Sequence, residues 1–345
     1  MLARRRHLVI PGLVALLGVA ILVSVAVGAV WISPWDSLRL IAWKVDLTPR
    51  PKGVLHSTSV ILFQLRLPRV LLAALVGAAL AAAGTVFQAL FRNPMADPAI
   101  IGVSSGAALG AITVILAGGG AALGGLGVPA AAFVGALGTG FLVYRLARLG
   151  PAVQVATLLL AGIAVAAVIS AAISLAMTFS GQEIRSIYFW LLGGLGARGW
   201  QSLATATPFV LAGVAVAMVS TGDLNLTALG EERAAQLGLD VERFKRLMLA
   251  TGSLLTAAAV SVAGLIGFVG LMTPHILRLF LGSDHRRLIP ASILGGAAFM
   301  VLADLAARTV VSPQEIPVGA VTAVLGGPFF LYLLRRERRA AGGRV

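Results

Sequence analysis

The sequence offers few residues whose types and spacing could carry out catalysis. Residues 102–106 read GVSSG and fit the G-x-S-x-G pattern of a serine nucleophile, which requires a turn between a strand and a helix. Here the pattern opens an apolar helix rich in small residues, and none of the four histidines is placed to pair with Ser104. We interpret it as small residues that permit close helix packing, and we expect no catalytic residue. The alternative, an intramembrane hydrolase, would require an activity that is lost when Ser104 is changed.

Metal, thiol and nucleotide chemistry also lack their usual residues. The chain has no cysteine, which excludes a disulfide framework, a thiolate metal site and a cysteine nucleophile. No G-x-x-x-x-G-K-[ST] motif occurs, and none of the three lysines, Lys44, Lys52 and Lys245, follows a glycine. We therefore expect no metal and no cofactor in this chain, and any nucleotide chemistry must come from another chain.

Asp304 is the only clear acidic residue within an apolar run, and Arg308 follows it by four residues. This spacing predicts an i,i+4 ion pair, which we place at the outer end of a helix. An ion-coupled carrier normally carries several ionisable groups along its path. An ion-coupled secondary transporter is therefore the alternative from a different functional class. It predicts uptake that collapses with an uncoupler and survives the loss of an ATPase partner.

The composition indicates that membrane-spanning helices position these residues. Of the 345 residues, 59% are hydrophobic and 12% are charged, whereas soluble domains have roughly 45–50% apolar and about 25% charged residues. A crossing needs about 20 apolar residues, so the chain has room for about ten crossings and no large extramembrane domain. The net charge of +14 would suggest nucleic acid in a soluble protein. In a membrane protein it marks cytoplasmic helix ends, so we expect no nucleic-acid partner.

Basic clusters set the topology. They lie at residues 4–6, 92, 145 with 148, 243–246, 278 with 286–287, and 335–339. If all are cytoplasmic, an even number of crossings separates each from the next. The apolar runs between them are 8–31, 70–91, 99–116, 129–143, 155–178, 204–219, 247–277, 290–307 and 318–334. The run 247–277 must supply two helices. We expect Gly264, Gly267, Gly270 and Pro274 to supply the break, with a full span followed by a short helix interrupted by proline.

This topology predicts one all-α membrane domain over residues 1–345, with ten transmembrane helices and both termini cytoplasmic. Ala83-Gly84 with Pro94 recurs 180 residues later as Ala263-Gly264 with Pro274. The two copies cross in opposite directions, which is the inverted-repeat arrangement of many transporters.

The longest polar cytoplasmic segment spans residues 221–246. We predict two short helices in it, one at about 227–237 and one from Asp240, with Gly238 as the helix stop and Asp240 as the N-cap. Two helices at the membrane face would form a docking surface for another chain. On the opposite side, Arg66 and Arg69 lie in the sequence RLPR at an outer helix mouth, where the positive-inside rule does not explain them.

Seven stretches, together with the segment 304–308, resemble one family. They read RLPR (66–69), GAALAAAG (77–84), FQALFRNPMADP (87–98), IGVSSGAALGA (101–111), LGEERAAQLGL (229–239), GLIGFVGLMTPHILRLFLGSDHRR (264–287) and EIPVGAVTAVLGGPFF (315–330). From about residue 31 to 335 the chain resembles the FecCD-type permeases of type II ABC importers, which carry ferric siderophores, haem or vitamin B12. The resemblance implies a multi-pass protein of the bacterial inner membrane and a homodimer around one pathway. It also implies two separate ATPase subunits that use ATP and Mg²⁺, and an extracytoplasmic substrate-binding protein.

The resemblance also implies roles for particular positions. Three arginines match those that receive carboxylates of the binding protein: Arg66, Arg69 and Arg308. The positions that match the contact with the ATPase are Leu229, Gly230, Glu231, Glu232, Ala235, Leu237, Gly238 and Leu239. Asn93 and Met95 match the inner gate.

The outer segment 182–200 is the part of the chain that could contact the cargo, because arginines lie near aromatic residues in it. Those expected along the substrate path are Arg185, Tyr188, Trp190 and Arg198. The resemblance implies an iron chelate as the cargo. Arginine beside aromatic rings suits an anionic planar macrocycle, so we prefer haem to a ferric siderophore. For these four residues an interfacial aromatic belt is the favoured interpretation and a substrate site is the second. The alternative cargo is cobalamin.

Overall fold

The computed structural model describes residues 7–28, 30–49, 51, 54–149, 152–196 and 198–342. Helices dominate these residues, and two-residue strands form one short antiparallel pair, with Arg148 opposite Val153. The elements are α1 (Val9–Ala26), α2 (Pro34–Lys44), α3 (His56–Val60), α4 (Leu67–Leu90), α5 (Val103–Leu116), α6 (Ala122–Gly125), α7 (Gly127–Ala147), β1 (Arg148–Leu149), β2 (Ala152–Val153), α8 (Val155–Thr178), α9 (Ile184–Leu192), α10 (Trp200–Val219), α11 (Thr221–Thr227), α12 (Glu231–Gln236), α13 (Val241–Ala263), α14 (Val269–Leu281), α15 (His285–Thr309) and α16 (Val318–Gly342).

The predicted spans correspond to helices of suitable length and composition. Within the described residues, seven helices are long and apolar enough to cross a membrane: α1, the continuous run His56–Leu90, α7, α8, α10, α13 and α15. An eighth candidate is α5 with the helical turns after it, bent by 111° at their junction. Two shorter apolar helices follow later in the chain, Val269–Leu281 and Val318–Leu333. These helices occupy the ten predicted positions, so the all-α membrane fold is confirmed.

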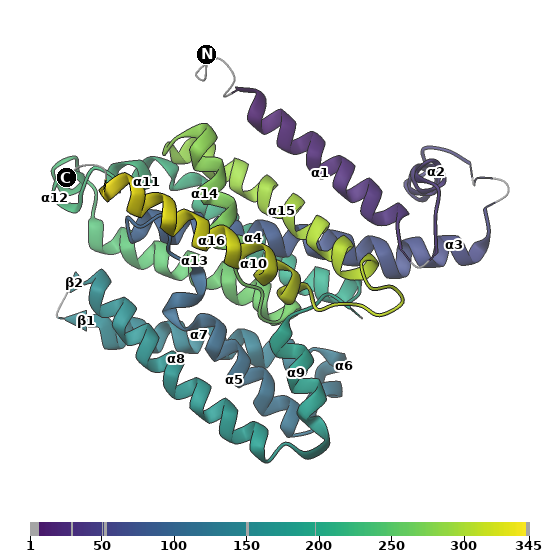
Figure 1. The fold of residues 1–345 in the computed structure, drawn as a ribbon, viewed down its shortest axis with the longest axis horizontal. Helices are drawn as coiled ribbons and strands as arrows, with labels where there is room; N and C mark the ends of the chain where they lie inside the picture. The colour runs from purple at the N-terminus through teal and green to yellow at the C-terminus, as the bar shows by residue number, and fades with distance from the viewer. Residues whose placement is uncertain are drawn as a thin grey trace.

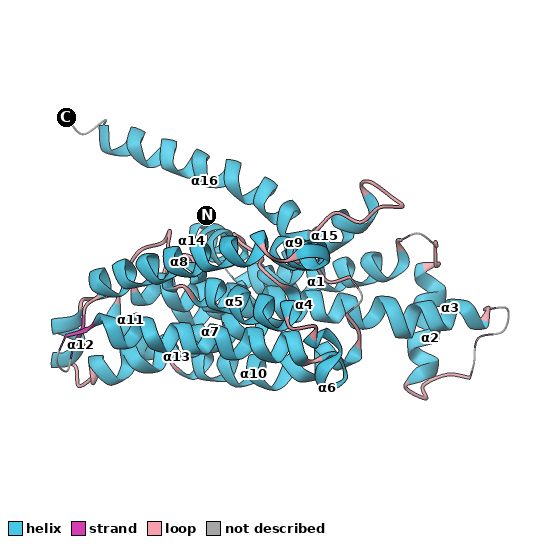
Figure 2. Ribbon diagram, turned by 90° about the horizontal axis from the view of Figure 1, so that it is seen from below, coloured by secondary structure: helices cyan, strands magenta, loops and turns pink. Residues whose placement is uncertain are grey.

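The two ends of the bundle carry different elements. Figures 1 and 2 show α12, the β1–β2 pair and the far end of α16 at one end, and α2 with α3 at the other. The first end holds the segment predicted to be cytoplasmic. Helix α4 begins beside α3 and α13 begins beside α12, so the two copies of the internal repeat run in opposite directions (Figure 1). Helix α16 stands away from the rest of the bundle in Figure 2.

Small residues let the central helices approach closely. Helix α4 is buried along most of its length and packs against α13, α14 and α15. A Cβ on Gly84 would lie 1.8 Å from the Gly270 carbonyl oxygen, and one on Gly77 would lie 2.1 Å from the Gly296 carbonyl oxygen. No side chain fits into either gap, so these crossings require glycine.

The GVSSG sequence serves the same kind of packing. Gly102 has a φ of +79° and starts α5, and a Cβ on Gly106 would lie 2.1 Å from Thr139 Oγ1 of α7. The motif therefore starts a helix that packs closely on α7 and does not form a strand-to-helix turn. The interpretation as a packing motif is confirmed.

The apolar run 247–277 breaks into two helices at Gly264 and Gly267, as predicted, but not at Gly270 or Pro274, which lie within α14. The chain leaves helical geometry between α13 and α14, at Gly264 (φ +72°) and Phe268 (φ +68°), and α14 continues through Pro274. Proline lacks an N–H, so the carbonyl of Gly270 loses its helical partner. Gln88 of α4 replaces that donor: its Nε2 lies 3.4 Å from the Gly270 oxygen and 3.1 Å from the Leu271 oxygen. The expectation of a helix interrupted at Pro274 was therefore wrong, because a neighbouring helix satisfies the freed carbonyl.

Candidate functional site

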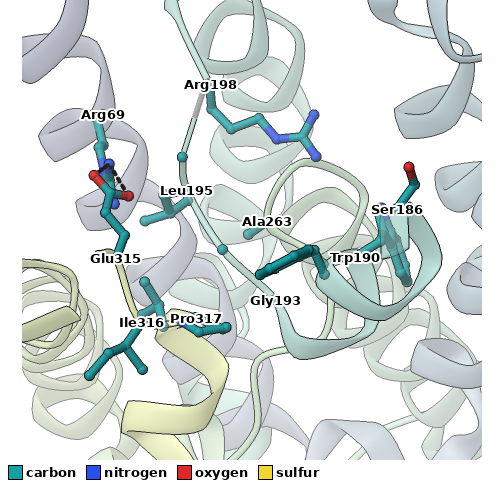
Figure 3. A pocket seen from close by; sticks show the side chains of 15 residues that line it. Arg69, Ser186, Trp190, Gly193, Leu195, Arg198, Ala263, Glu315, Ile316 and Pro317 are labelled. Atoms are coloured by element: carbon teal, nitrogen blue, oxygen red, sulfur yellow. Dashed lines mark hydrogen bonds and ion pairs between the residues drawn. The ribbon is translucent and has the colours of Figure 1, made fainter. Parts of the chain in front are cut away.

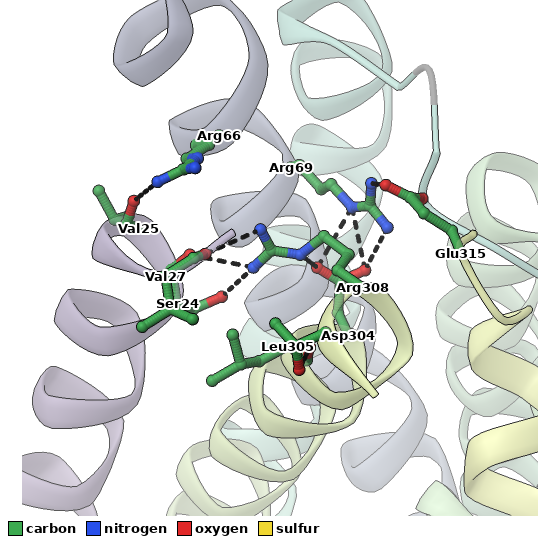
Figure 4. Close-up of polar contacts among 10 residues, drawn as sticks. Ser24, Val25, Val27, Arg66, Arg69, Asp304, Leu305, Arg308 and Glu315 are labelled. Carbon is green, nitrogen blue, oxygen red and sulfur yellow. Dashed lines mark hydrogen bonds and ion pairs between the residues drawn. The ribbon is translucent and has the colours of Figure 1, made fainter. Parts of the chain in front are cut away.

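An arginine cluster lies where the outer ends of α1, α4 and α15 meet (Figure 4). Arg66 is 7% exposed, and its Nη1 donates to the carbonyl oxygens of Val25 and Ala26, both at 2.8 Å, while its Nη2 donates to Val30. The Val25 and Ala26 carbonyls end α1 and have no partner within that helix, and Val30 lies just beyond it. A cation at a helix C-terminus also interacts favourably with the helix dipole. Arg66, the last residue of a π-helical turn (Ile61–Arg66) that runs into α4, therefore caps α1.

Arg308 makes a second set of contacts with the end of α1. Its Nη2 donates to the carbonyl oxygen of Ser24 at 3.0 Å and to the Ser24 hydroxyl at 2.6 Å. Its Nε lies 3.1 Å from Asp304 Oδ2, which confirms the predicted i,i+4 ion pair. Arg308 thus joins α15 to α1.

Arg69 links two carboxylates. Its Nη2 lies 2.9 Å from Asp304 Oδ1, and its Nη1 donates to Glu315 Oε2 at 2.9 Å. The Asp304 side chain is fully buried and is held between Arg69 and Arg308, which offsets the cost of burying its charge. Glu315 is the half-exposed member of the cluster, with 49% of its side chain accessible.

The structure therefore brings together the three arginines assigned to docking, but each donates to groups within this chain. Their side chains are at most 12% exposed. The docking role stays a prediction. Sequence reasoning missed Ser24 and Glu315, because neither stands at a helical spacing from its arginine.

Two adjoining cavities open beside this cluster. One, of about 340 Å³, is lined by residues that include Phe189, Trp190 and Arg198, and the other, of about 460 Å³, extends from Arg198 toward Arg66 and Arg308. Figure 3 shows the first cavity with Arg69, Glu315 and Arg198 at its edge. Arg69 and Glu315 also line the second cavity. The two cavities thus share a charged boundary.

Arg198 is the notable cation of this region. It lies in the connection between α9 and α10, and its guanidinium makes no hydrogen bond or ion pair with any described residue. Burial lowers the pKa of Arg198, yet an arginine remains protonated in proteins. The cavity wall therefore presents an unneutralised positive charge.

The four residues expected along the substrate path separate into two groups. Trp190 is 7% exposed and lines the first cavity together with Arg198. Arg185 instead stacks over Phe189 at 5.7 Å, and Tyr188 is exposed, so neither lines a described cavity. Arg198 and Trp190 thus meet at one site, whereas Arg185 and Tyr188 lie on the outer surface of α9.

At the opposite end, the polar segment 221–246 differs in part from its prediction. Gly238 has a φ of +91°, and the Asp240 carboxylate accepts from the Arg243 N–H at 3.0 Å, so the predicted stop and N-cap are confirmed. The expected helix at about 227–237 is the shorter α12, because a turn at Gly230 (φ +110°) precedes it, and α11 before that turn was not predicted. The second expected short helix is the first part of the membrane-spanning α13. That expectation was wrong because the polar N-terminal turns of α13 continue without a break into an apolar helix.

Glu231 at the start of α12 faces the bundle. Its Oε2 accepts from Lys245 Nζ at 2.6 Å, and its Oε1 lies 4.0 Å from Arg92 Nη2 at the end of α4. Lys245 is 8% exposed and also bonds Glu242 at 3.1 Å. Sequence reasoning had no signal for this pairing, because Glu231 and Lys245 are 14 residues apart in different helices.

The other residues assigned to ATPase contact differ in exposure. Those that face outward are Leu229, Glu232, Ala235, Leu237 and Gly238, and those that are half-buried are Gly230 and Leu239. The outward group forms a surface that is free to meet another chain within the described part of the protein. The contact itself stays a prediction.

The predicted gate residues lie in the turn after α4, next to α12. Asn93 Oδ1 accepts from the Met95 N–H at 2.9 Å, which fixes the turn, and Arg92 has a φ of +48°. Asp97 then caps a short helical turn by accepting from the Ala99 N–H at 2.8 Å. The ion pair between Arg92 and Glu231, at 4.0 Å, joins this turn to α12.

The described residues contain no group of three or more histidine, aspartate or glutamate side chains that could hold a metal ion. The carboxylates of Asp304 and Glu315 are already paired with Arg69.

Comparisons with known proteins agree on one group. Residues 16–336 match the model of the FecCD transport family. The cobalamin import system permease protein BtuC of Halobacterium salinarum is 49% identical over 89% of this chain and 81% of its own length. The hemin transport system permease protein HmuU of Yersinia pestis is 43% identical over 81% of this chain and 84% of its own length. A solved structure of an inward-facing metal-chelate type ABC transporter superposes with a TM-score of 0.83 and 32% identity, covering 95% of this chain and 98% of that one.

Proposed function

The chain belongs to the FecCD transport family and is a permease subunit of an ABC importer in the inner membrane, and from this premise we propose that its cargo is a metal-bearing macrocycle, with haem first. One observation carries the proposal. Arg198, a cation without a partner among the described residues, lines the outer cavities beside Trp190 and Phe189. Haem has a flat aromatic ring and two carboxylates. Arginine binds carboxylates through paired hydrogen bonds and stacks on planar rings.

Cobalamin is the second candidate, because a relative named for cobalamin import is 49% identical to this chain. Both candidates are tetrapyrrole-derived metal chelates of similar breadth, but cobalamin carries a bridging phosphate and no free carboxylates. A ferric siderophore stays a third iron chelate to be tested. The choice depends on whether the cargo presents carboxylates to Arg198.

We propose that transport proceeds by alternating access, driven by two separate ATPase subunits on a dimer of this chain. The exposed side of α12 is the proposed ATPase contact, and Glu231 on its inner side joins it to Arg92 and Lys245. Movement of α12 would then displace the turn that carries Asn93 and Met95. Such a switch between two packings is a common form of gating.

We also propose that the extracytoplasmic binding protein docks over the arginine cluster. Glu315 is the exposed carboxylate on Arg69, so an incoming carboxylate can replace it without exposing a new buried charge. Arg66 and Arg308 keep their hold on α1 in this exchange.

The cargo is tested with the complex of permease, ATPase and cognate binding protein. Haem, a ferric siderophore and cobalamin are each added to the binding protein, and stimulation of ATP hydrolysis by the complex is measured. We expect the strongest stimulation with haem. Stimulation by cobalamin alone would transfer the assignment to the second candidate, and stimulation by none of the three would contradict the proposal.

A further inference from the structure

A groove separate from the proposed transport path lies between α7 and α13. It has a volume of about 450 Å³, and its walls are mainly the apolar side chains of Leu137, Phe141, Leu249 and Leu254. Phe141 is 64% exposed, so the groove opens onto the outside of the described part of the chain. None of these residues lines the outer cavities or the arginine cluster.

The groove is polar at one end and apolar at the other. Tyr144 and Arg246 lie at its polar end, near the C-terminus of α7 and the N-terminus of α13. Leu137 lies seven residues from Tyr144 along α7, a distance of about 10 Å at the rise of an α-helix. The polar end is on the side of α12 and the β1–β2 pair (Figure 1), which is the cytoplasmic side of the assigned topology. The groove therefore runs from the cytoplasmic boundary into the apolar region of the membrane.

At the polar end of the groove, Arg246 and Tyr144 have hydrogen-bond donors that are not used by the described residues. Arg246 Nε donates to the Glu242 carbonyl oxygen at 3.2 Å, and its terminal nitrogens make no contact of this kind with a described residue. The Tyr144 hydroxyl likewise has no hydrogen-bond partner among the described residues. Arg243, one turn earlier, differs because it pairs with Asp240 at 2.9 Å and is 79% exposed.

We propose that this groove binds one anionic phospholipid of the cytoplasmic leaflet. Arg246 and Tyr144 donate to its phosphate, and an acyl chain lies along Phe141, Leu249 and Leu254. The occupant follows from the match in polarity and depth, because a phospholipid places its charge at the boundary and its chains about 10 Å and further inward. Negative charge is selected because basic pockets between helices on this side of a membrane attract anionic headgroups.

The test uses the full-length permease in phosphatidylcholine nanodiscs that contain phosphatidylglycerol, with bound lipid measured by native mass spectrometry. We expect the wild type to retain phosphatidylglycerol in preference to phosphatidylcholine. Arg246→Gln should lower this retention about fivefold, and addition of Tyr144→Phe should lower it further. Arg243→Gln is the matched control and should retain the lipid as the wild type does. Equal retention by Arg246→Gln and wild type would overturn the proposal.

A second variant separates lipid binding from folding. Ala250→Phe places a ring in the groove without changing any charge, and Leu247→Phe adds the same ring to an exposed position that does not line the groove. We expect Ala250→Phe alone to lose bound phosphatidylglycerol while both variants stay monodisperse. If Ala250→Phe instead separates permease dimers and leaves bound lipid unchanged, the groove is an interface between two copies and the proposal is wrong.

Discussion

The contact of Gln88 with α14 can be tested as a double-mutant cycle. Gln88 is 1% exposed, and its amide donates toward the Gly270 and Leu271 carbonyls while its oxygen accepts from Arg278 Nη2 at 3.2 Å. Gln88→Leu keeps the volume but leaves the Gly270 carbonyl and one Arg278 donor unpaired. Each unpaired buried group costs about 1–3 kcal/mol, so we expect the free energy of unfolding to fall by about 3 kcal/mol.

Pro274→Ala should rescue part of this loss. Alanine restores the N–H that the Gly270 carbonyl would accept within α14, so Gln88→Leu should cost about 1 kcal/mol less in the Pro274→Ala background. The measurement is equilibrium unfolding by denaturant in mixed micelles, for wild type, both single variants and the double variant. The control is Thr85→Val, at another buried position of α4. The Thr85 hydroxyl donates only to the Ala81 carbonyl of its own helix, at 2.8 Å, so its loss should not depend on the residue at position 274. Additive effects of Gln88→Leu and Pro274→Ala, within about 0.5 kcal/mol, would refute the reasoning.

Three further predictions concern the two ends of the molecule. Glu231→Gln should weaken the contacts with Lys245 and Arg92 by about 1 kcal/mol, since Glu231 is partly exposed, and lower uptake per ATP hydrolysed about fivefold. Glu183→Gln is the control: this exposed side chain lies at the other end of the bundle and has no ion pair in the described chain, so it should leave that ratio unchanged. Equal ratios for the two variants would contradict the link. Charge reversal of Arg69 to Glu should abolish stimulation of ATPase activity by the binding protein in complexes that still assemble, and unchanged stimulation would remove the docking proposal. A hydrogen bond from Asn225 and one from the Arg286 N–H lower the pKa of Asp284. This carboxylate therefore stabilises the fold above its unfolded pKa of about 3.9, and the contribution is lost as pH falls through the lower pKa of the folded state. As pH falls through these two pKa values, the thermal midpoint of Asp284→Asn should fall less than that of the wild type. Equal changes of the midpoint with pH in the two proteins would refute this role of Asp284.

The number and order of the spans could be predicted from the sequence because both follow from local composition. Apolar length fixes how many crossings the chain can make, and basic residues fix their direction. Even the division of the run 247–277 follows from this parity. The N-cap at Asp240 and the stop at Gly238 were also predictable, since each depends on a side chain and its own neighbouring backbone.

The contacts that join distant segments could not be predicted in this way. Arg66 caps a helix that ends 40 residues earlier, and Gln88 satisfies a carbonyl 182 residues later. Neither pairing has a sequence signature, because any buried donor that the fold brings near could serve. For the same reason the sequence placed an interruption at Pro274, where tertiary contacts keep the helix intact.

Site residues show the same division. The sequence correctly brought together Asp304 and Arg308, which are one helical turn apart. It grouped Arg185 with Arg198 because they are close in sequence, but the structure places only Arg198 at the cavities. The difference arises because α9 turns Arg185 outward onto Phe189, whereas Arg198 lies in the connection after that helix.

The central claim is that this chain imports a carboxylate-bearing metal macrocycle with energy from ATP, and Arg198 provides its most direct test. The permease, ATPase and binding protein are reconstituted in proteoliposomes, and ATP-dependent uptake of haem and of haem dimethyl ester is measured for wild type and Arg198→Gln. We predict that the wild type takes up haem in the presence of an uncoupler, and that Arg198→Gln lowers haem uptake about tenfold, as expected for a lost charged hydrogen bond, while uptake of the ester is unchanged. Haem uptake that needs an ion gradient instead of ATP, or that is equal in the two proteins, would contradict the account.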